Sequence, residues 1–402
     1  MNTHMRIRKG LILQLFSGAN IQRWNDKIRP AELTELDKQA HKMIIAYVLG
    51  KYEENKESFS WIDIIEGSIF EYLQRTEITD IKPTIFREIK KKTGEYEQLK
   101  DWVYRRLNPI ITPLGPEFKS RYRIYFSEEE ETISRKVINA AHIYATKWEF
   151  ELIEALNPRE RDIEIPEIVS NLSDELKKYK KLKGMKKLEG NLNLQAFVNL
   201  CGRLRVQSRW SHVRRLTHTS VLGHMLIVAI LAYLFSVQMD ACPRRRINNY
   251  FTGLFHDLPE ALTRDIISPV KGAVEGISKI IKEYEKEQMQ KKIYEIVPAQ
   301  WHSEIKMYAE DEFADLATVN EIQRRVTSKM IKEKYDDDKF NARDGSLIKA
   351  CDDLAAFTEA YIAICNGANA EGLQEAKHKM KDEYRNKVVA GIAFGPIYAD
   401  FE

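Results

Sequence analysis

Cysteine is scarce in this 402-residue sequence, and the number and spacing of the cysteines argue against two classes of domain. The cysteines are Cys201, Cys242, Cys351 and Cys365, and no two of them form a Cys-x-x-Cys pair. This spacing argues against a zinc ribbon, and the small number argues against a disulfide framework. A reducing compartment is the simplest explanation, so we expect the protein to be cytoplasmic.

The sequence also lacks a strong net charge and a long apolar run. Lys and Arg number 63 against 60 Asp and Glu, which gives a net charge of +3. This balance argues against a protein whose overall charge binds nucleic acid. Any anion site must therefore be formed by a few neighbouring basic residues. No uninterrupted apolar run approaches the ~20 residues of a membrane span, so we expect no membrane partner.

Helical periodicity, in contrast, runs from end to end, and alternating strand-like segments are few. Apolar residues recur at helical spacing in several segments, and the one at 225–234 is apolar nearly all round. The chain is also long enough for two compact domains. We therefore predict an all-α fold, with helices at residues 40–49, 132–156, 225–234, 273–296 and 346–364.

Residue pairs recur along the chain at a nearly constant offset. Offsets of 186 and then 185 residues relate Arg23-Trp24 to Arg209-Trp210, Ala46-Tyr47 to Ala232-Tyr233, Ile69-Phe70 to Leu254-Phe255, and Asp80-Ile81 to Asp265-Ile266. Farther on, residues 137–142 resemble residues 347–352. Two offsets that differ by one residue over such a span predict two tandem copies of one helical domain.

The predicted domains are residues 1–156 and 192–402, with a charged linker at 157–191 between them. The linker begins with Pro158 and Pro166, and it is rich in lysine: Lys177, Lys178, Lys180, Lys181, Lys183, Lys186 and Lys187. Such a strip could attract a polyanion. No aromatic or arginine residues interleave it as in a nucleic-acid surface, so we favour a solvated linker and expect no stable nucleic-acid partner.

The most informative stretch runs from residue 255 to residue 271, Phe-His-Asp-Leu-Pro-Glu-Ala-Leu-Thr-Arg-Asp-Ile-Ile-Ser-Pro-Val-Lys. It places His256 beside Asp257, with Glu260 four residues after the histidine. All three side chains can point into one site from a helix and its exit. A His-Asp pair alone means little, because a histidine bonded to a backbone carbonyl is more common, but the longer string is far more specific.

This string resembles the HD-domain metal-dependent phosphohydrolases, and most closely the branch of the YfbR-type 5'-deoxynucleotidases. The resemblance implies an all-helical fold in which a first histidine, the His-Asp pair and a distant last aspartate hold one divalent metal. The implied ligands are His224, His256, Asp257 and Asp352. These ligands leave the metal open among Mn, Co, Fe, Zn and Mg, and the imidazoles argue least for Mg.

The first and last of these ligands also have a basis in the sequence. His224 opens the most apolar segment of the chain, where an unpaired ring would be costly to bury, although a core histidine bonded to a carbonyl is the alternative. His212 and His218 do not match the family motif, so we expect them at the surface. Asp353 should face about 100° away from Asp352 around a helix, toward solvent.

The resemblance also implies roles in catalysis and substrate binding. Glu260 would be the general acid/base, while Asp257 would act through the metal. Arg209 would bind the phosphate, Trp210 would pack against the sugar or base, and Asp265 would accept a sugar hydroxyl. Each substrate contact has a structural alternative: Arg209 paired to an acid, Trp210 in the core, and Asp265 as a helix cap.

The first copy has lost these groups. Its residues at the ligand positions are Lys38 for His224, Glu71 for His256, Tyr72 for Asp257 and His142 for Asp352, and Arg75 replaces Glu260. A protonated lysine offers no lone pair to a metal. We therefore predict a degenerate first domain that pairs with the second as an intramolecular pseudo-dimer with one active site, with further self-association left open.

The sequence thus favours a phosphohydrolase that releases phosphate from a small nucleotide, most of all a deoxynucleoside 5'-monophosphate. Two alternatives remain: a nucleotide triphosphohydrolase or phosphodiesterase on the same metal site, and a non-catalytic nucleotide-sensing protein. Glu260 argues against the second alternative, because a binding module needs no acid/base group there.

Overall fold

The computed structural model describes residues 6–128, 130–266, 274 and 276–402. Within these residues the regular secondary structure is helical apart from two short antiparallel strand pairs. This confirms the all-α prediction. Each of the five predicted segments contains a helix in its described part. Residues 273 and 275, at the start of the predicted helix 273–296, lie outside the described residues. Residues 267–271, the end of the diagnostic string, lie outside the described residues.

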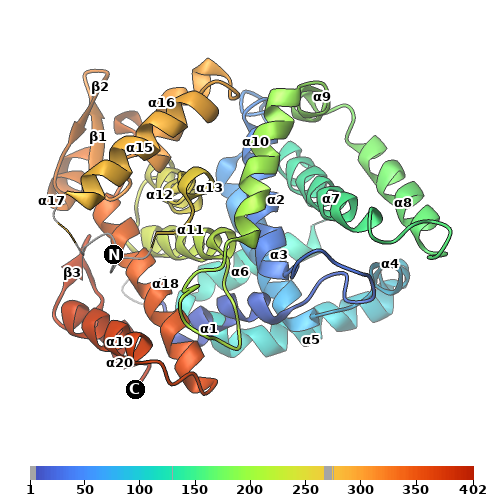
Figure 1. The fold of residues 1–402 in the computed structure, drawn as a ribbon, viewed down its shortest axis with the longest axis horizontal. Coiled ribbons are helices and arrows are strands. Elements are labelled where there is room, and N and C mark those ends of the chain that lie inside the picture. The colour runs from blue at the N-terminus through green and yellow to red at the C-terminus, as the bar shows by residue number, and fades with distance from the viewer. Residues whose placement is uncertain (1–5, 129, 267–273, 275) are drawn as a thin grey trace. The chain divides into compact units, whose positions relative to one another are not determined.

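The chain divides into two compact units, Asn2–Met185 and Lys186–Glu402 (Figure 1). The elements of the first unit are α1 (Lys9–Ser17), η1 (Gly18–Asn20), α2 (Glu35–Gly50), α3 (Trp61–Ile78), α4 (Pro83–Lys91), α5 (Thr93–Ile111), η2 (Thr112–Leu114), α6 (Pro116–Ser127), α7 (Ile133–Glu154) and α8 (Ile165–Lys178). Helix α9 (Lys183–Glu189) spans the division.

The helices of the second unit are α10 (Leu192–Gly202), η3 (Arg203–Val206), α11 (Val221–Gln238), α12 (Pro243–Phe255), α13 (Glu260–Thr263), α15 (Ile277–Lys292), η4 (Ala299–Trp301), α16 (His302–Ala309), α17 (Ser328–Met330), η5 (Ile331–Tyr335), η6 (Asp338–Phe340), α18 (Gly345–Cys365), α19 (Glu371–Tyr384) and α20 (Gly395–Ala399). Its two antiparallel hairpins pair β1 (Leu316–Val319) with β2 (Ile322–Arg325), and β3 (Val388–Val389) with β4 (Ile392–Ala393).

Helix α2 is the core of the first unit. The Thr34 hydroxyl accepts the backbone N–H of Asp37 and so caps the start of the helix. Every residue of α2 is buried, and the helix packs against α7, which also contacts α3. Two of the buried residues, Lys38 and Lys42, are lysines, so this core requires polar partners for its charges.

Most of the predicted linker is packed on the first unit, which differs from the solvated segment expected at 157–191. Residues up to Met185 belong to that unit, and Ile165 and Leu176 are buried. The N–H of Gly184 donates to the Glu53 carboxylate over 2.8 Å. The lysines of this stretch are nevertheless all exposed, because the helices α8 and α9 turn their leucines and methionine inward.

Helix α11 lies at the centre of the second unit and corrects one expectation from the sequence. Its residues Val221–Gln238 are long and apolar enough to cross a membrane by length and composition, whereas no such run was expected. In the structure, 94% of this segment is buried by protein. A core helix passes the same length and composition test, and the burial of α11 identifies it as one.

Helices α12 and α18 pack against α11 and against each other (Figure 1). The closest approach of α12 to α11 is at Gly253, where an added Cβ would lie 2.6 Å from the Cα of Ala229. Only glycine allows two helix backbones to come this close. This crossing places the end of α12 beside the first turn of α11.

A buried polar group joins α12 to the start of α18. The Arg245 guanidinium donates to both oxygens of Asp344, over 2.6 and 2.7 Å. The Asn249 amide donates to Asp344 over 2.8 Å and accepts the Asp344 N–H over 2.9 Å. Because Asp344 immediately precedes α18, these bonds set the position of that helix relative to α12.

We predict that Gly253→Ala destabilises the protein by about 1–3 kcal/mol, because the new methyl group meets backbone atoms that cannot turn away. The measurement is the thermal unfolding midpoint. Gly372→Ala is the matched control, since an added Cβ at this helical glycine would meet nothing within 4 Å. An unchanged midpoint for Gly253→Ala would contradict the proposed tight crossing.

Candidate metal centre

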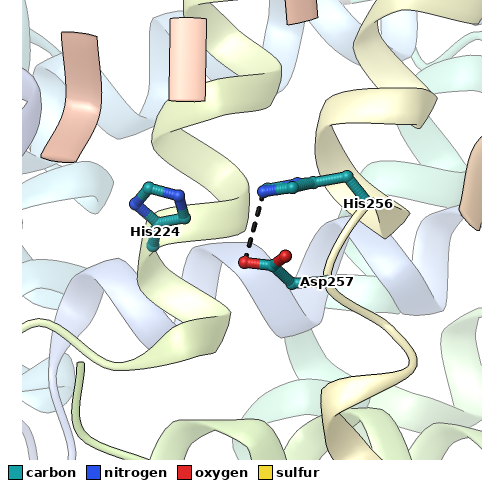
Figure 2. A group of neighbouring side chains, drawn as sticks. All are labelled: His224, His256 and Asp257. Carbon is teal, nitrogen blue, oxygen red and sulfur yellow. Dashed lines mark ion pairs between the residues drawn. The ribbon is translucent and has the colours of Figure 1, made fainter. Parts of the chain in front are cut away.

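Three side chains with metal-ligating atoms lie together in the second unit (Figure 2). The ligand atoms of His224, His256 and Asp257 all lie within 4.8 Å of one another, and the imidazole centroids are 5.6 Å apart. His224 belongs to the first turn of α11, while His256 and Asp257 directly follow α12. The crossing at Gly253 is therefore what brings the three residues together.

His256 presents a buried nitrogen toward this cluster. Its Nδ1 donates to the carbonyl oxygen of Gly253 over 2.8 Å, which leaves Nε2 on the side of Asp257. Nε2 lies 3.2 Å from Asp257 Oδ2, yet it makes no hydrogen bond of good geometry within the described part of the chain. A buried ring nitrogen without a hydrogen-bond partner, next to a carboxylate, fits a divalent cation.

Charge at the cluster also favours a cation. Burial would lower the pKa of His256, but the Asp257 carboxylate outweighs this effect and raises the pKa to about 9. Burial would raise the pKa of Asp257, but His256 and Arg209 hold it well below its usual range. Asp257 is thus ionised at neutral pH, and a metal ion would replace the proton on His256.

Asp352, the predicted last ligand, is attached to the cluster through His224. Its Oδ1 lies 3.0 Å from His224 Nε2, and its Oδ2 accepts from the Lys349 ammonium over 3.1 Å. The four ligands implied by the family resemblance therefore come from α11, the end of α12 and α18, and they meet in one place. Their role as metal ligands stays a prediction.

A cavity of about 310 Å³ opens beside the cluster. Its lining includes six residues predicted from the sequence: Arg209, His256, Asp257, Glu260, Asp265 and Asp352. Glu260 begins the short helix α13 and is buried, whereas Asp265 is half-buried. The acid/base candidate and the metal ligands thus face the same space.

Trp210 is not among the described residues that line the cavity, and its predicted packing against a sugar or base stays a prediction. Its indole N–H donates to Glu359 over 2.8 Å, and its ring packs against a cluster that includes Ala360 and Leu373. The alternative, a structural tryptophan, agrees with this geometry.

Arg209 combines both roles considered for it, since it lines the cavity and pairs with Asp257 and Glu359.

The expectation for Asp353 is wrong. Asp353 is half-buried, accepts from Lys349 Nζ over 2.6 Å and accepts from the Tyr384 hydroxyl over 2.7 Å. The helical-wheel argument placed it away from Asp352 but did not include the packing of α19 against α18. His212 and His218 are exposed, as predicted for histidines outside the site.

Two features of the site were missed in the sequence. Lys282 and Lys286 of α15 and Lys349 of α18 line the cavity, and the spacing of the first two by one helical turn was a usable signal.

Glu359 is fully buried behind the cluster, where it contacts His224, Arg209 and Trp210. Glu149 follows His142 by the same distance as Glu359 follows Asp352, so extending the repeat would have found it.

Glu359 is ionised despite its burial. Desolvation would raise the pKa of its carboxyl, but Arg209 and then His224 outweigh this and lower the pKa to about 2. The carboxylate therefore provides a fixed negative charge behind the candidate metal centre. Its three contacts come from the first turn of α11 and from the loop before it.

Comparison with known proteins agrees with this geometry. A family model described as HD domain matches residues 201–381, which contain the four predicted metal ligands, Glu260 and the predicted substrate contacts. No curated protein sequence matches the chain. This match supports the resemblance found in the sequence at the level of the HD-domain superfamily. The chain thus matches the HD-domain family model over residues 201–381.

Proposed function

We propose that the second unit is a metal-dependent phosphohydrolase that releases phosphate from small nucleotides, most favourably deoxynucleoside 5'-monophosphates. The observation that carries the proposal is the buried Nε2 of His256, which has no hydrogen-bond partner among the described groups and stands beside Asp257. His224, His256, Asp257 and Asp352 would hold one divalent metal. When bound, this metal would supply a Lewis acid next to the phosphoryl group.

The remaining steps use side chains of the cavity. Arg209, held by Glu359 and Asp257, turns a planar guanidinium toward the cavity, where it can bind two phosphate oxygens. Glu260 is positioned to hold the proton that the leaving alkoxide requires. Asp265 can accept a hydroxyl of the sugar.

The charge and size of the cavity support a substrate with one phosphate. A volume of about 310 Å³ is at the small end of ligand sites. The lining has more carboxylates than cations: Asp257, Glu260, Asp265, Glu285, Glu310, Asp311, Glu312 and Asp352 against Arg209, Lys282, Lys286 and Lys349. Additional phosphate groups would be repelled by this excess of negative charge.

One observation favours the second candidate, a triphosphohydrolase or phosphodiesterase. Lys282 and Lys286 are exposed, line the cavity one helical turn apart, and form no ion pair with the described residues. They could bind phosphates beyond the one that is cleaved. The larger number of carboxylates leads us to rank this candidate second.

We further propose that the two units are copies of one domain and form a pseudo-dimer with one active site. Features inside each unit support common descent. Trp24 and Trp210 both have a positive φ, of 54° and 57°. Isolated bridges pair Gln22 with Thr34 and Ser208 with Ser220, and each bridge ends on the hydroxyl residue that caps α2 or α11.

In the first unit, the side chains at the ligand positions bind other protein groups rather than a metal. Lys38 Nζ lies 2.5 Å from His142 Nδ1, and Lys42 pairs with Glu71 over 2.9 Å. The Tyr72 hydroxyl donates to the carbonyl oxygen of Leu15. Lysine side chains from α2 thus take the place that a cation would have, which supports a single metal site per chain.

We predict that Asp257→Ala reduces hydrolysis to the uncatalysed rate, because the variant loses a metal ligand. Phosphate release is measured with metal-loaded protein on deoxynucleoside mono-, di- and triphosphates and on a phosphodiester. The matched control is Asp382→Ala, at an exposed position of α19. Equal rates for parent and Asp257→Ala would refute the site, while nucleotide binding without turnover by the parent would favour a sensing protein.

For Glu260→Gln we expect kcat to fall by roughly 10²–10⁴-fold, with metal content unchanged, since an amide cannot exchange the proton. Glu287→Gln is the control on the exposed part of α15. Full activity of the Glu260 variant would exclude it as the acid/base group.

Elemental analysis of protein purified with Mn²⁺ should find one tightly bound metal per chain. Two metals per chain would contradict the single-site pseudo-dimer, since the second would require ligands in the first unit.

A further inference from the structure

Three N–H groups converge on the buried carboxylate of Glu359. One oxygen, Oε1, lies 3.2 Å from His224 Nδ1. The other, Oε2, accepts from Arg209 Nε over 3.3 Å and from Trp210 Nε1 over 2.8 Å. The side chains of Glu359 and His224 are both fully buried, so water cannot replace these contacts.

The contact with His224 determines which ring nitrogen is available to a metal. Both ring nitrogens face a carboxylate, because Nδ1 lies 3.2 Å from Glu359 and Nε2 lies 3.0 Å from Asp352. An ionised carboxylate only accepts hydrogen bonds, so once a metal occupies the side of Nε2 and Asp352, Glu359 would hold the remaining ring proton on Nδ1. The lone pair is then on Nε2, the nitrogen that lies 3.0 Å from Asp352. Carboxylates that hold ligand histidines in this way commonly raise metal affinity.

The contact with Arg209 fixes a second group of the same site. Arg209 uses Nε for Glu359, while its Nη1 lies 3.5 Å from Asp257 Oδ2. The guanidinium is therefore held at one edge, and its position at the cavity depends on Glu359. One carboxylate thus touches both a candidate metal ligand and the candidate phosphate-binding cation.

The first unit contains the same arrangement without the histidine. Glu149 is buried, and its Oε2 accepts from Arg23 Nε over 2.8 Å and from Trp24 Nε1 over 3.1 Å. The residue of α2 that matches His224 is Lys38, which contacts His142. Holding an Arg-Trp turn is thus common to both glutamates, whereas the helix residue that Glu359 contacts is His224 and the matching residue of α2 is Lys38.

We propose that Glu359 is a positioning residue that sets the tautomer of His224 and the orientation of Arg209, and so couples metal binding to phosphate binding. This inference rests on the proposed function, because it concerns the metal site of that function. It adds a residue seven positions beyond the last predicted ligand, on the same helix α18.

The test compares Glu359→Gln with Glu149→Gln. Glutamine keeps one acceptor oxygen, so if that oxygen serves Arg209 and Trp210, the amide NH₂ faces His224 Nδ1 and moves the ring proton to Nε2. We expect the affinity for Mn²⁺, measured by titration calorimetry on the full chain, to fall by about 10–100-fold in Glu359→Gln. Glu149→Gln should lower the unfolding midpoint but leave Mn²⁺ affinity unchanged.

A second measurement does not depend on the folding of any variant. In Zn²⁺-loaded parent protein, the ¹⁵N chemical shifts of the His224 ring should report a proton on Nδ1 and none on Nε2. A proton on Nε2 would overturn the proposal, and so would parent-like Mn²⁺ affinity in Glu359→Gln. A parent protein that binds no Mn²⁺ would instead overturn the proposed function together with this inference.

Discussion

The close crossing of α12 over α11 is the constraint on which the site depends. At Gly253 the two backbones approach so closely that no side chain fits between them. His256 lies one turn beyond this point and donates to the Gly253 carbonyl, so the crossing positions and orients its ring. His224 lies just over one turn before the contact residue Ala229 on the other helix. A wider crossing would separate the two imidazoles.

Burial of charge is the second constraint on the second unit. Arg245 binds Asp344 and thereby attaches α12 to the start of α18. Asp352 lies two turns into that helix, so a polar contact remote from the cavity positions the last candidate ligand. Buried ion pairs add little net stability, but they are costly to break, and this makes the arrangement specific.

Under the proposed duplication, the two units differ in the groups that stand at their matching positions. In the second unit, carboxylates and imidazoles gather beside a cavity, and the buried nitrogen of His256 has no hydrogen-bond partner within the described residues. In the first unit, Lys38 contacts His142 and Lys42 pairs with Glu71, and burial holds the pKa of Lys38 well below its usual range. The first unit differs at all four ligand positions, and the side chains at those positions contact one another or other protein groups instead of a metal.

The sequence by itself determined the all-α class, the helices and the residues of the diagnostic string, because these depend on local periodicity and on a motif of short range. The family resemblance also proposed His224 and Asp352 as ligands, and the structure places both beside the His-Asp pair while their role stays a prediction. Asp353 could not be placed, because its environment is created by Tyr384 of another helix.

Tertiary structure alone decided which side chains meet across helices. The position of Glu359 behind His224 and Arg209, and of Trp210 away from the cavity, follows from the packing of α18 against the loop before α11. Whether α11 is a core helix or a membrane span also depends on what covers it, and composition does not contain that information. Sequence periodicity describes one element at a time, whereas burial and hydrogen bonding depend on the neighbours that folding supplies.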